Sequence, residues 1–144
     1  MAPKNEPPAG SVRTQVSALP LQRDEQGNLR VLLITSRETR RWIIPKGWPM
    51  KGLDDSEAAA REALEEAGVT GRVKRKPIGT YQYWKRGAAS FELCEVKVYP
   101  LEVERQLETW REKGQREAHW FSPEDAADLV EEPGLRALIA TLRA

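Results

Sequence analysis

The sequence predicts a single domain of mixed class, α/β (α+β), because strand-like and helix-like segments occur together without the repeated βαβ period of a parallel sheet. The chain contains 144 residues, a length that one domain commonly has. It shows no internal repeat and no sign of a second domain. We therefore expect the domain over residues 11–144 and a disordered tail over residues 1–10, which contain prolines but no apolar run.

Strands are predicted by short apolar or β-branched segments that are bounded by turn residues. The polar, glycine-containing stretch at residues 23–28 predicts a turn between the first two strands. Pro45 ends the third strand and leads into a glycine-containing loop. The expected strands are Val12–Leu19, Leu29–Ser36, Trp42–Ile44, Val73–Lys76, Ile78–Trp84, Phe91–Tyr99 and His119–Phe121.

Capping signals predict where the helices begin and end. Asp54, followed by Glu57, has the spacing of a capping box, and Gly68 is typical of a helix C-terminus. A helix is therefore expected over about residues 55–67. The other expectations are a helix that begins after Ser122 and Pro123, a final helix over about residues 135–142, and a helix or loop over residues 104–113.

Composition limits the classes of partner. The chain has 23 Lys and Arg against 22 Asp and Glu, a formal net charge of +1, so we do not expect it to bind nucleic acid or an anionic membrane. No apolar stretch approaches the roughly 20 residues that span a bilayer. Cys94 is the single cysteine and has no partner for an internal disulfide, which favours a reducing, cytoplasmic location. The sequence leaves open whether the protein is a monomer or a homodimer.

The helix expected over residues 55–67 carries an acidic stripe. At about 100° per residue, Glu62, Glu65 and Glu66 lie on one side, and small apolar residues lie on the other. Arg61 is spaced to pair with Glu65 at i,i+4. Clustered carboxylates on a rigid element are suitable ligands for a hard divalent ion such as Mg²⁺. A glutamate-rich helix face in solvent is the alternative interpretation.

A cationic group precedes this helix and flanks a glycine loop. Its members are Arg37, Arg41, Lys46 and Lys51, with Arg40 between the first two. Guanidinium groups match phosphate oxygens, and lysine supplies a point charge. Cations opposite a metal-binding helix form the electrostatic arrangement that binds a polyphosphate. The basic residues alone are equally compatible with a solubilising surface.

Gly47 to Val69 resembles the Nudix box of the Nudix hydrolases. That box has Gly, five variable residues, Glu, seven variable residues, Arg-Glu, an aliphatic residue, a variable residue, Glu-Glu, a variable residue, Gly and an aliphatic residue. The chain supplies Gly47 and then the run from Arg61 to Val69 at the required spacing. It departs at the first glutamate, where it has Leu53. That role is then absent, or is taken by Asp54, Asp55 or Glu57.

The resemblance extends over about residues 11–142 and is closest to the diphosphoinositol polyphosphate phosphohydrolase-like branch. It implies the Nudix α/β/α sandwich, in which a mixed β-sheet lies between helices. It also implies Mg²⁺ or Mn²⁺ as cofactor, with Arg61 orienting Glu65. The implied metal ligands are Glu62, Glu65, Glu66 and the backbone carbonyl of Gly47.

The implied reaction is hydrolysis of a phosphoanhydride bond in a small polyphosphate, by attack of a metal-activated water on phosphorus. Glu65 is the first choice for the general base, and Glu117 and Glu112 are alternatives from a later loop. Dinucleoside and diphosphoinositol polyphosphates are the leading substrates. A nucleoside triphosphate or ADP-ribose pyrophosphatase is an alternative, as is a non-catalytic domain that binds phosphate ligands. His119 is expected to pack in a strand rather than to act in catalysis.

Overall fold

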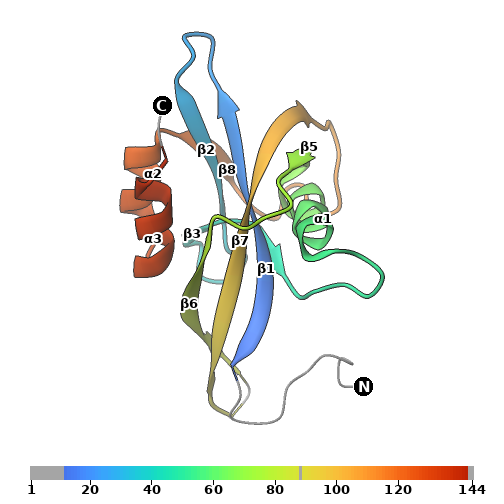
Figure 1. The fold of residues 1–144 in the computed structure, drawn as a ribbon, viewed down its shortest axis with the longest axis vertical. Helices are drawn as coiled ribbons and strands as arrows, with labels where there is room; N and C mark the ends of the chain where they lie inside the picture. Colours follow the sequence, from blue (N-terminus) through green and yellow to red (C-terminus); the bar gives the residue numbers. More distant parts are fainter. Residues whose placement is uncertain (1–11, 88, 143–144) are drawn as a thin grey trace.

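A mixed β-sheet separates the helix α1 (Asp55–Ala67) from the helices α2 (Pro123–Leu129) and α3 (Pro133–Ala140) (Figure 1). The computed structural model describes residues 12–87 and 89–142. The expected α/β/α sandwich is confirmed. The tail expected over residues 1–10 lies outside the described residues.

The sheet is mixed because one central pair of strands is parallel. Strand β1 runs parallel to β7 from Arg13, opposite Cys94, to Leu21, opposite Glu102. The other strand pairs in the described chain are antiparallel. The main strand order is β3-β2-β1-β7-β5, with β4 on β1, β6 on β7 and β8 on β2. The strands are β1 (Arg13–Arg23), β2 (Leu29–Thr35), β3 (Trp42–Ile43), β4 (Lys46–Gly47), β5 (Val69–Val73), β6 (Gly79–Arg86), β7 (Phe91–Gln106) and β8 (Ala118–Phe121).

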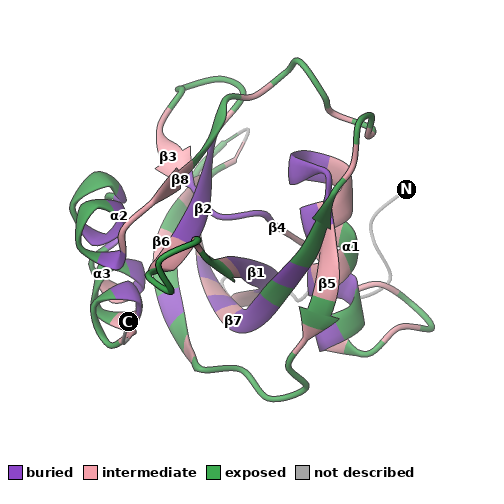
Figure 2. Ribbon diagram, turned by 90° about the horizontal axis from the view of Figure 1, so that it is seen from above, coloured by how far each residue is buried: buried purple, intermediate pink, exposed green. Residues whose placement is uncertain are grey.

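Both faces of β2 are buried, which explains why this strand reads as a continuous apolar run. Leu32 and Ile34 pack in the cluster that includes the alanines of α1. Val31 and Leu33 alternate with them and pack against the buried side of α2 and α3. Figure 2 shows the buried residues of the helices turned toward the sheet on each side. The functional residues are therefore carried by strand ends and by the connecting loops.

Helix α1 begins and ends where the sequence predicts. Asp54 is the N-cap, and its backbone N–H donates to Glu57 Oε1 at 2.9 Å. Gly68 ends the helix in the left-handed conformation, with φ 69°. Every helix in the described part of the chain is too short or too polar to span a membrane.

Three strand predictions were wrong in their bounds. Strand β1 continues past the expected end at Leu19 to Arg23. Strand β7 continues past Tyr99 to Gln106. Pro100 is tolerated in β7 because it lies between the segment that pairs with β6, which ends at Val98, and the segment that pairs with β5, which begins at Leu101. The Pro100 carbonyl still accepts a hydrogen bond from the Lys74 N–H at 2.9 Å. The strand expected at Val73–Lys76 is instead β5, which directly follows Gly68 and pairs with this extension.

Candidate active site

A basic cleft of about 380 Å³ lies between the loop at residues 36–41 and the end of β6. Three of the four predicted phosphate-binding residues line it, whereas Lys51 is exposed on a turn and does not. The lining contains six cationic side chains and one acidic side chain. The lining residues are Ser36, Arg37, Glu38, Thr39, Arg41, Ile43, Lys46, Tyr83, Trp84, Lys85, Arg86 and Arg116.

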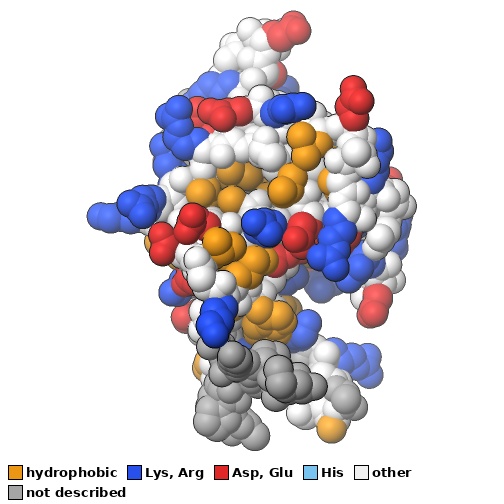
Figure 3. Space-filling view, turned by 90° about the vertical axis from the view of Figure 1, so that its right-hand side faces the viewer, with side chains coloured by type: hydrophobic (Ala, Val, Ile, Leu, Met, Phe, Trp, Pro, Cys, Tyr) orange, Lys and Arg blue, Asp and Glu red, His pale blue; other side chains and the backbone are white. Residues whose placement is uncertain are grey.

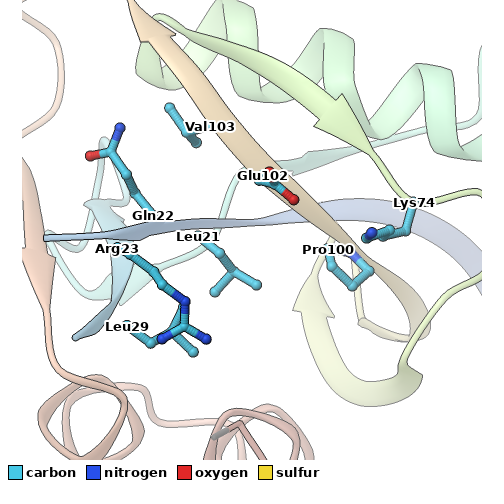
Figure 4. A pocket seen from close by; sticks show the side chains of 8 residues that line it. All are labelled: Leu21, Gln22, Arg23, Leu29, Lys74, Pro100, Glu102 and Val103. Carbon is cyan, nitrogen blue, oxygen red and sulfur yellow. The ribbon is translucent and has the colours of Figure 1, made fainter. Parts of the chain in front are cut away.

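This positive charge is local. Figure 3 shows that the face over α1 carries acidic and basic side chains next to each other. A larger hollow of about 450 Å³ lies near the ends of β1 and β2 and beside β7, and its lining includes Leu21, Pro100 and Val103 (Figure 4). Glu102 is the one acidic residue in that lining. The basic cleft is therefore the better candidate for binding a polyanion.

Lys46 lies at the inner end of the cleft on β4. Its ammonium nitrogen is 5.1 Å from the centre of the Tyr83 ring, and the Tyr83 hydroxyl donates to Gln15 Oε1 at 2.7 Å. Burial lowers the pKa of Lys46, while the Glu66 carboxylate opposes this by favouring the charged form. A half-buried cation beside an acidic helix is well placed to bind an anion that reaches the carboxylates.

The arginines of the loop at residues 36–41 are held from two sides. Arg41 pairs with Glu131 at 3.5 Å and with Glu132 at 3.4 Å, in the connection between α2 and α3. Arg37 Nη1 donates to Gln115 Oε1 at 3.2 Å. Arg40 forms an exposed pair with Glu117 at 3.2 Å. These contacts fix one wall of the cleft with residues that are distant in the sequence.

The carboxylate cluster consists of Glu62, Glu66 and Glu112. Glu62 lies against Gly47, where an added Cβ would be 2.2 Å from Glu62 Oε2. Glu62 and Glu66 share a hydrogen bond. Burial is the main cause that raises the pKa of both groups, to about 8 for Glu66. Burial therefore favours the neutral form of both carboxyls when no cation is bound beside them.

Arg116 connects this cluster to the cleft. Its side chain is 9% exposed, and its Nε lies 2.8 Å from Glu112 Oε1. Its Nη2 lies 3.8 Å from Glu66 Oε1, and its Nη1 donates to the Thr35 carbonyl at 3.0 Å. The same residue lines the basic cleft. Arg116 was not predicted, because it lies in a polar segment without a recognisable pattern.

The structure separates three predicted catalytic residues. Glu65 pairs with Arg111 at 3.6 Å rather than with Arg61. Arg61 is exposed and forms no ion pair with another described residue. Glu117 is also exposed and pairs with Arg40, whereas Glu112, the other loop candidate, joins the carboxylate cluster. The expected Arg61 to Glu65 pair was therefore wrong, since an i,i+4 pair contributes only about 0.2–0.5 kcal/mol and Arg111 replaces it.

None of the residues proposed to replace the first box glutamate reaches the cluster. Asp54 pairs with Arg75 at 3.4 Å, and Asp55 pairs with Lys97 at 3.1 Å. Glu57 accepts the hydrogen bond that begins α1. Each side chain has a structural partner, so the role at Leu53 is not taken over by its acidic neighbours.

The carboxylate cluster has the chemistry of a site for a divalent cation. Its oxygen donors, their burial and the space beside Gly47 fit a hard ion. Over residues 12–87 and 89–142, however, no group of three or more Asp, Glu, His or Cys side chains is already placed to hold a metal. Ion binding requires that Glu62 and Glu66 are ionised, which their burial opposes when no cation is bound.

Other cleft residues that sequence reasoning missed come from β6. Tyr83 and Lys85 lie on the strand next to β7, and Arg86 lies at its end. The run of Trp84, Lys85 and Arg86 was a usable signal, because exposed aromatic and basic residues together are typical of phosphate or base contacts. His119 lies on β8 with its ring 5.7 Å from that of Trp42, which supports aromatic packing, although its side chain is 60% exposed.

One family model covers both the sheet and the acidic helix α1. The family model described as the NUDIX domain matches residues 12–142. This chain belongs to the Nudix family. The predicted resemblance is confirmed, and the match includes α1, the cleft and the closing helices.

Curated relatives are similar over most of this chain. Nudix hydrolase 13, mitochondrial, from Arabidopsis thaliana is 33% identical over 117 residues, which cover 74% of this chain and 55% of the relative. Diphosphoinositol polyphosphate phosphohydrolase 2 from Rattus norvegicus is 33% identical over 111 residues, covering 76% and 58%. The chain thus spans about half the length of the curated relatives it matches. Several relatives are named as mitochondrial, and the cytoplasmic location stays a prediction.

Solved structures show the same fold at lower identity. An Ap4A hydrolase from C. elegans superposes with a TM-score of 0.64 at 18% identity, covering 90% of this chain and 95% of that one. The NUDIX domain of Shewanella oneidensis NrtR, complexed with ADP ribose, gives a TM-score of 0.64 at 17% identity, covering 93% and 90%. These similarities establish the architecture that holds the site.

Proposed function

We propose that this Nudix chain is a divalent-metal-dependent hydrolase of phosphoanhydride bonds in small polyphosphates. The observation that carries the proposal is the contact, through Arg116, between the buried carboxylate cluster and a cleft lined by six cations. The cluster is the cation site, and the cleft binds the polyphosphate. The names of the relatives, a diphosphoinositol polyphosphate phosphohydrolase and an Ap4A hydrolase, support dinucleoside and diphosphoinositol polyphosphates as substrates.

The cleft residues bind and orient the phosphates. Arg37, Arg41 and Lys46 supply donors and positive charge along the chain of phosphates, and these donors favour the charge that develops during bond cleavage. In the reaction, a water oxygen forms a bond to one phosphorus while the bond from that phosphorus to the bridging oxygen breaks. The remaining phosphate leaves with the electron pair of that bond. A bound Mg²⁺ or Mn²⁺ ion supplies Lewis acidity and lowers the pKa of water.

The carboxylates hold the metal and accept the proton from water. Glu62 and Glu66, with the Gly47 backbone beside them, are the proposed metal ligands, together with Glu65. Glu65 is the proposed general base. The loop that carries Glu112 lies against this end of α1, because the Glu112 backbone N–H donates to the Glu65 backbone carbonyl at 3.0 Å. Catalytic roles for Glu117 and Arg61 stay proposals, and both side chains are exposed.

A substrate panel tests the proposal. Purified protein with Mg²⁺ or Mn²⁺ is incubated with diadenosine and diphosphoinositol polyphosphates, nucleoside triphosphates and ADP-ribose, and phosphate-containing products are quantified. We expect turnover of at least one compound that ceases when a chelator is added. Absence of turnover with every compound and both metals contradicts the proposal. Relative kcat/KM values identify the substrate class.

The variant Glu66→Gln separates a hydrolase from a non-catalytic domain that binds phosphate ligands. This alternative is favoured by Leu53 and by the absence, among the residues that the structure describes, of three side chains already placed to hold a metal. In a hydrolase, this substitution lowers kcat by orders of magnitude while the fold survives. In a binding domain, affinity for a polyphosphate is nearly unchanged and there is no turnover to lose. Glu124→Gln, an exposed change in the first turn of α2, is the matched control.

A further inference from the structure

We infer that Arg116 is a positioning residue that competes with the divalent metal for Glu66 and, once the metal is bound, serves the polyphosphate cleft. The inference rests on the proposed function and extends it to a residue outside the Nudix box. Arg116 is the described cleft residue that forms an ion pair with a carboxylate of the acidic cluster.

The three contacts of Arg116 differ in strength. The 2.8 Å contact with Glu112 and the 3.0 Å hydrogen bond to the Thr35 carbonyl are short. The 3.8 Å contact with Glu66 is long for a charge-assisted hydrogen bond. Two strong contacts therefore anchor the guanidinium, and the weak one is readily exchanged.

Burial makes the weak contact energetically important. The side chains of Arg116 and Glu66 are 9% and 8% exposed, so water screens their charges poorly. When Arg116 pairs with Glu66, its positive charge offsets part of the attraction that the carboxylate exerts on a second cation. A metal ion at Glu66 repels the same guanidinium, so the two cations oppose each other at one carboxylate.

The contacts with Glu112 and Thr35 determine where the Arg116 guanidinium remains when it no longer pairs with Glu66. Glu112 and Thr35 keep the guanidinium at the border of the cleft, near the loop that carries Arg37 and Arg41. The Nη2 group that leaves Glu66 keeps N–H donors and positive charge, which suit phosphate oxygens. Arg116 thus strengthens polyphosphate binding and weakens metal binding, and removing it has opposite effects on the two affinities.

The test measures metal binding without substrate. Titration calorimetry with MgCl₂ and MnCl₂ alone compares the wild type with Arg116→Met, which keeps aliphatic volume but removes the charge. We expect the variant to bind the metal about tenfold more tightly, within the range typical of coupled sites. We also expect KM for the polyphosphate to rise about tenfold, with a smaller change in kcat.

Two further variants keep the test decisive. Arg72→Ala removes an exposed charge on β5 and controls for net charge. Arg116→Lys retains the positive charge but cannot keep all three contacts at once. We expect it to change metal affinity and KM in the same directions as Arg116→Met, but less. It replaces Arg116→Met in the test if that variant fails to fold. Unchanged or weaker metal binding in the folded Arg116 variants overturns the inference. Failure of the wild type to bind either metal contradicts the proposed function instead.

Discussion

The Glu62 carboxylate occupies space that Gly47 leaves by having no side chain, since a Cβ there would lie 2.2 Å from Glu62 Oε2. Gly47 does not belong to the positive-φ glycines, so alanine at this position meets no backbone strain. We predict that Gly47→Ala displaces Glu62 and lowers metal affinity and kcat/KM by about 10-fold to 100-fold, as losses of supporting contacts at metal sites commonly do. Calorimetry and steady-state kinetics measure both quantities.

Gly52 provides the matched control in the same loop. It has φ +86°, and an added Cβ there meets no atom within 4 Å. Gly52→Ala should therefore reduce the free energy of unfolding by about 1–2 kcal/mol through backbone strain and leave metal affinity unchanged. If both alanine variants lose metal affinity equally, loop strain rather than the position of Glu62 explains the effect.

The packing of Trp110 on Gly68 gives a prediction for stability. A Cβ at Gly68 would lie 2.3 Å from Trp110 Cδ2, and Gly68 has φ +69°. Gly68→Ala should lower the free energy of unfolding by about 1–2 kcal/mol from the left-handed backbone, plus about 1–3 kcal/mol from displacing the ring. Urea denaturation measures the loss. In a Trp110→Ala background, Gly68→Ala should lower the free energy of unfolding by less than it does in the wild type. Equal losses in the two backgrounds would contradict the proposed contact.

The cleft arginines should affect substrate binding more than chemistry. Arg41→Ala removes a lining guanidinium, and a hydrogen bond to a charged group contributes about 1.5–3 kcal/mol. We expect KM for the preferred polyphosphate to rise about 10-fold to 100-fold, with a smaller fall in kcat. Steady-state kinetics at two salt concentrations test this. An equal effect from Arg72→Ala would show that net charge, not the cleft, is responsible.

The features that the sequence predicted well depend on neighbours close along the chain. The bounds of α1 follow from Asp54, Glu57 and Gly68, all within one helix and its caps. The stripe of Glu62 and Glu66 follows from helical periodicity. These signals act over a few residues, so tertiary packing does not reverse them.

The features that were missed depend on strand pairing. Lys85 and Arg86 reach the cleft because β6 pairs with β7, and Arg116 reaches Glu66 because the loop before β8 lies against α1. The position of the same loop against α1 also explains why Glu65 pairs with Arg111 and not with Arg61. Each of these contacts joins residues that are far apart in sequence, and no local periodicity records such a pairing.

The buried carboxylates predict how pH affects the metal-free protein. Burial raises the pKa of Glu66 to about 8 from 4.5 and raises that of Glu62 in the same direction. The folded chain therefore binds more protons than the unfolded chain between these values, so the free energy of unfolding should fall as pH rises from about 4.5 to about 8. Urea denaturation in a chelating buffer across this range measures the slope. Glu66→Gln removes the group that titrates and should flatten the slope, and Mg²⁺ should reduce it by compensating the charged carboxylates. A wild-type slope that persists unchanged in Glu66→Gln would mean that other groups cause it.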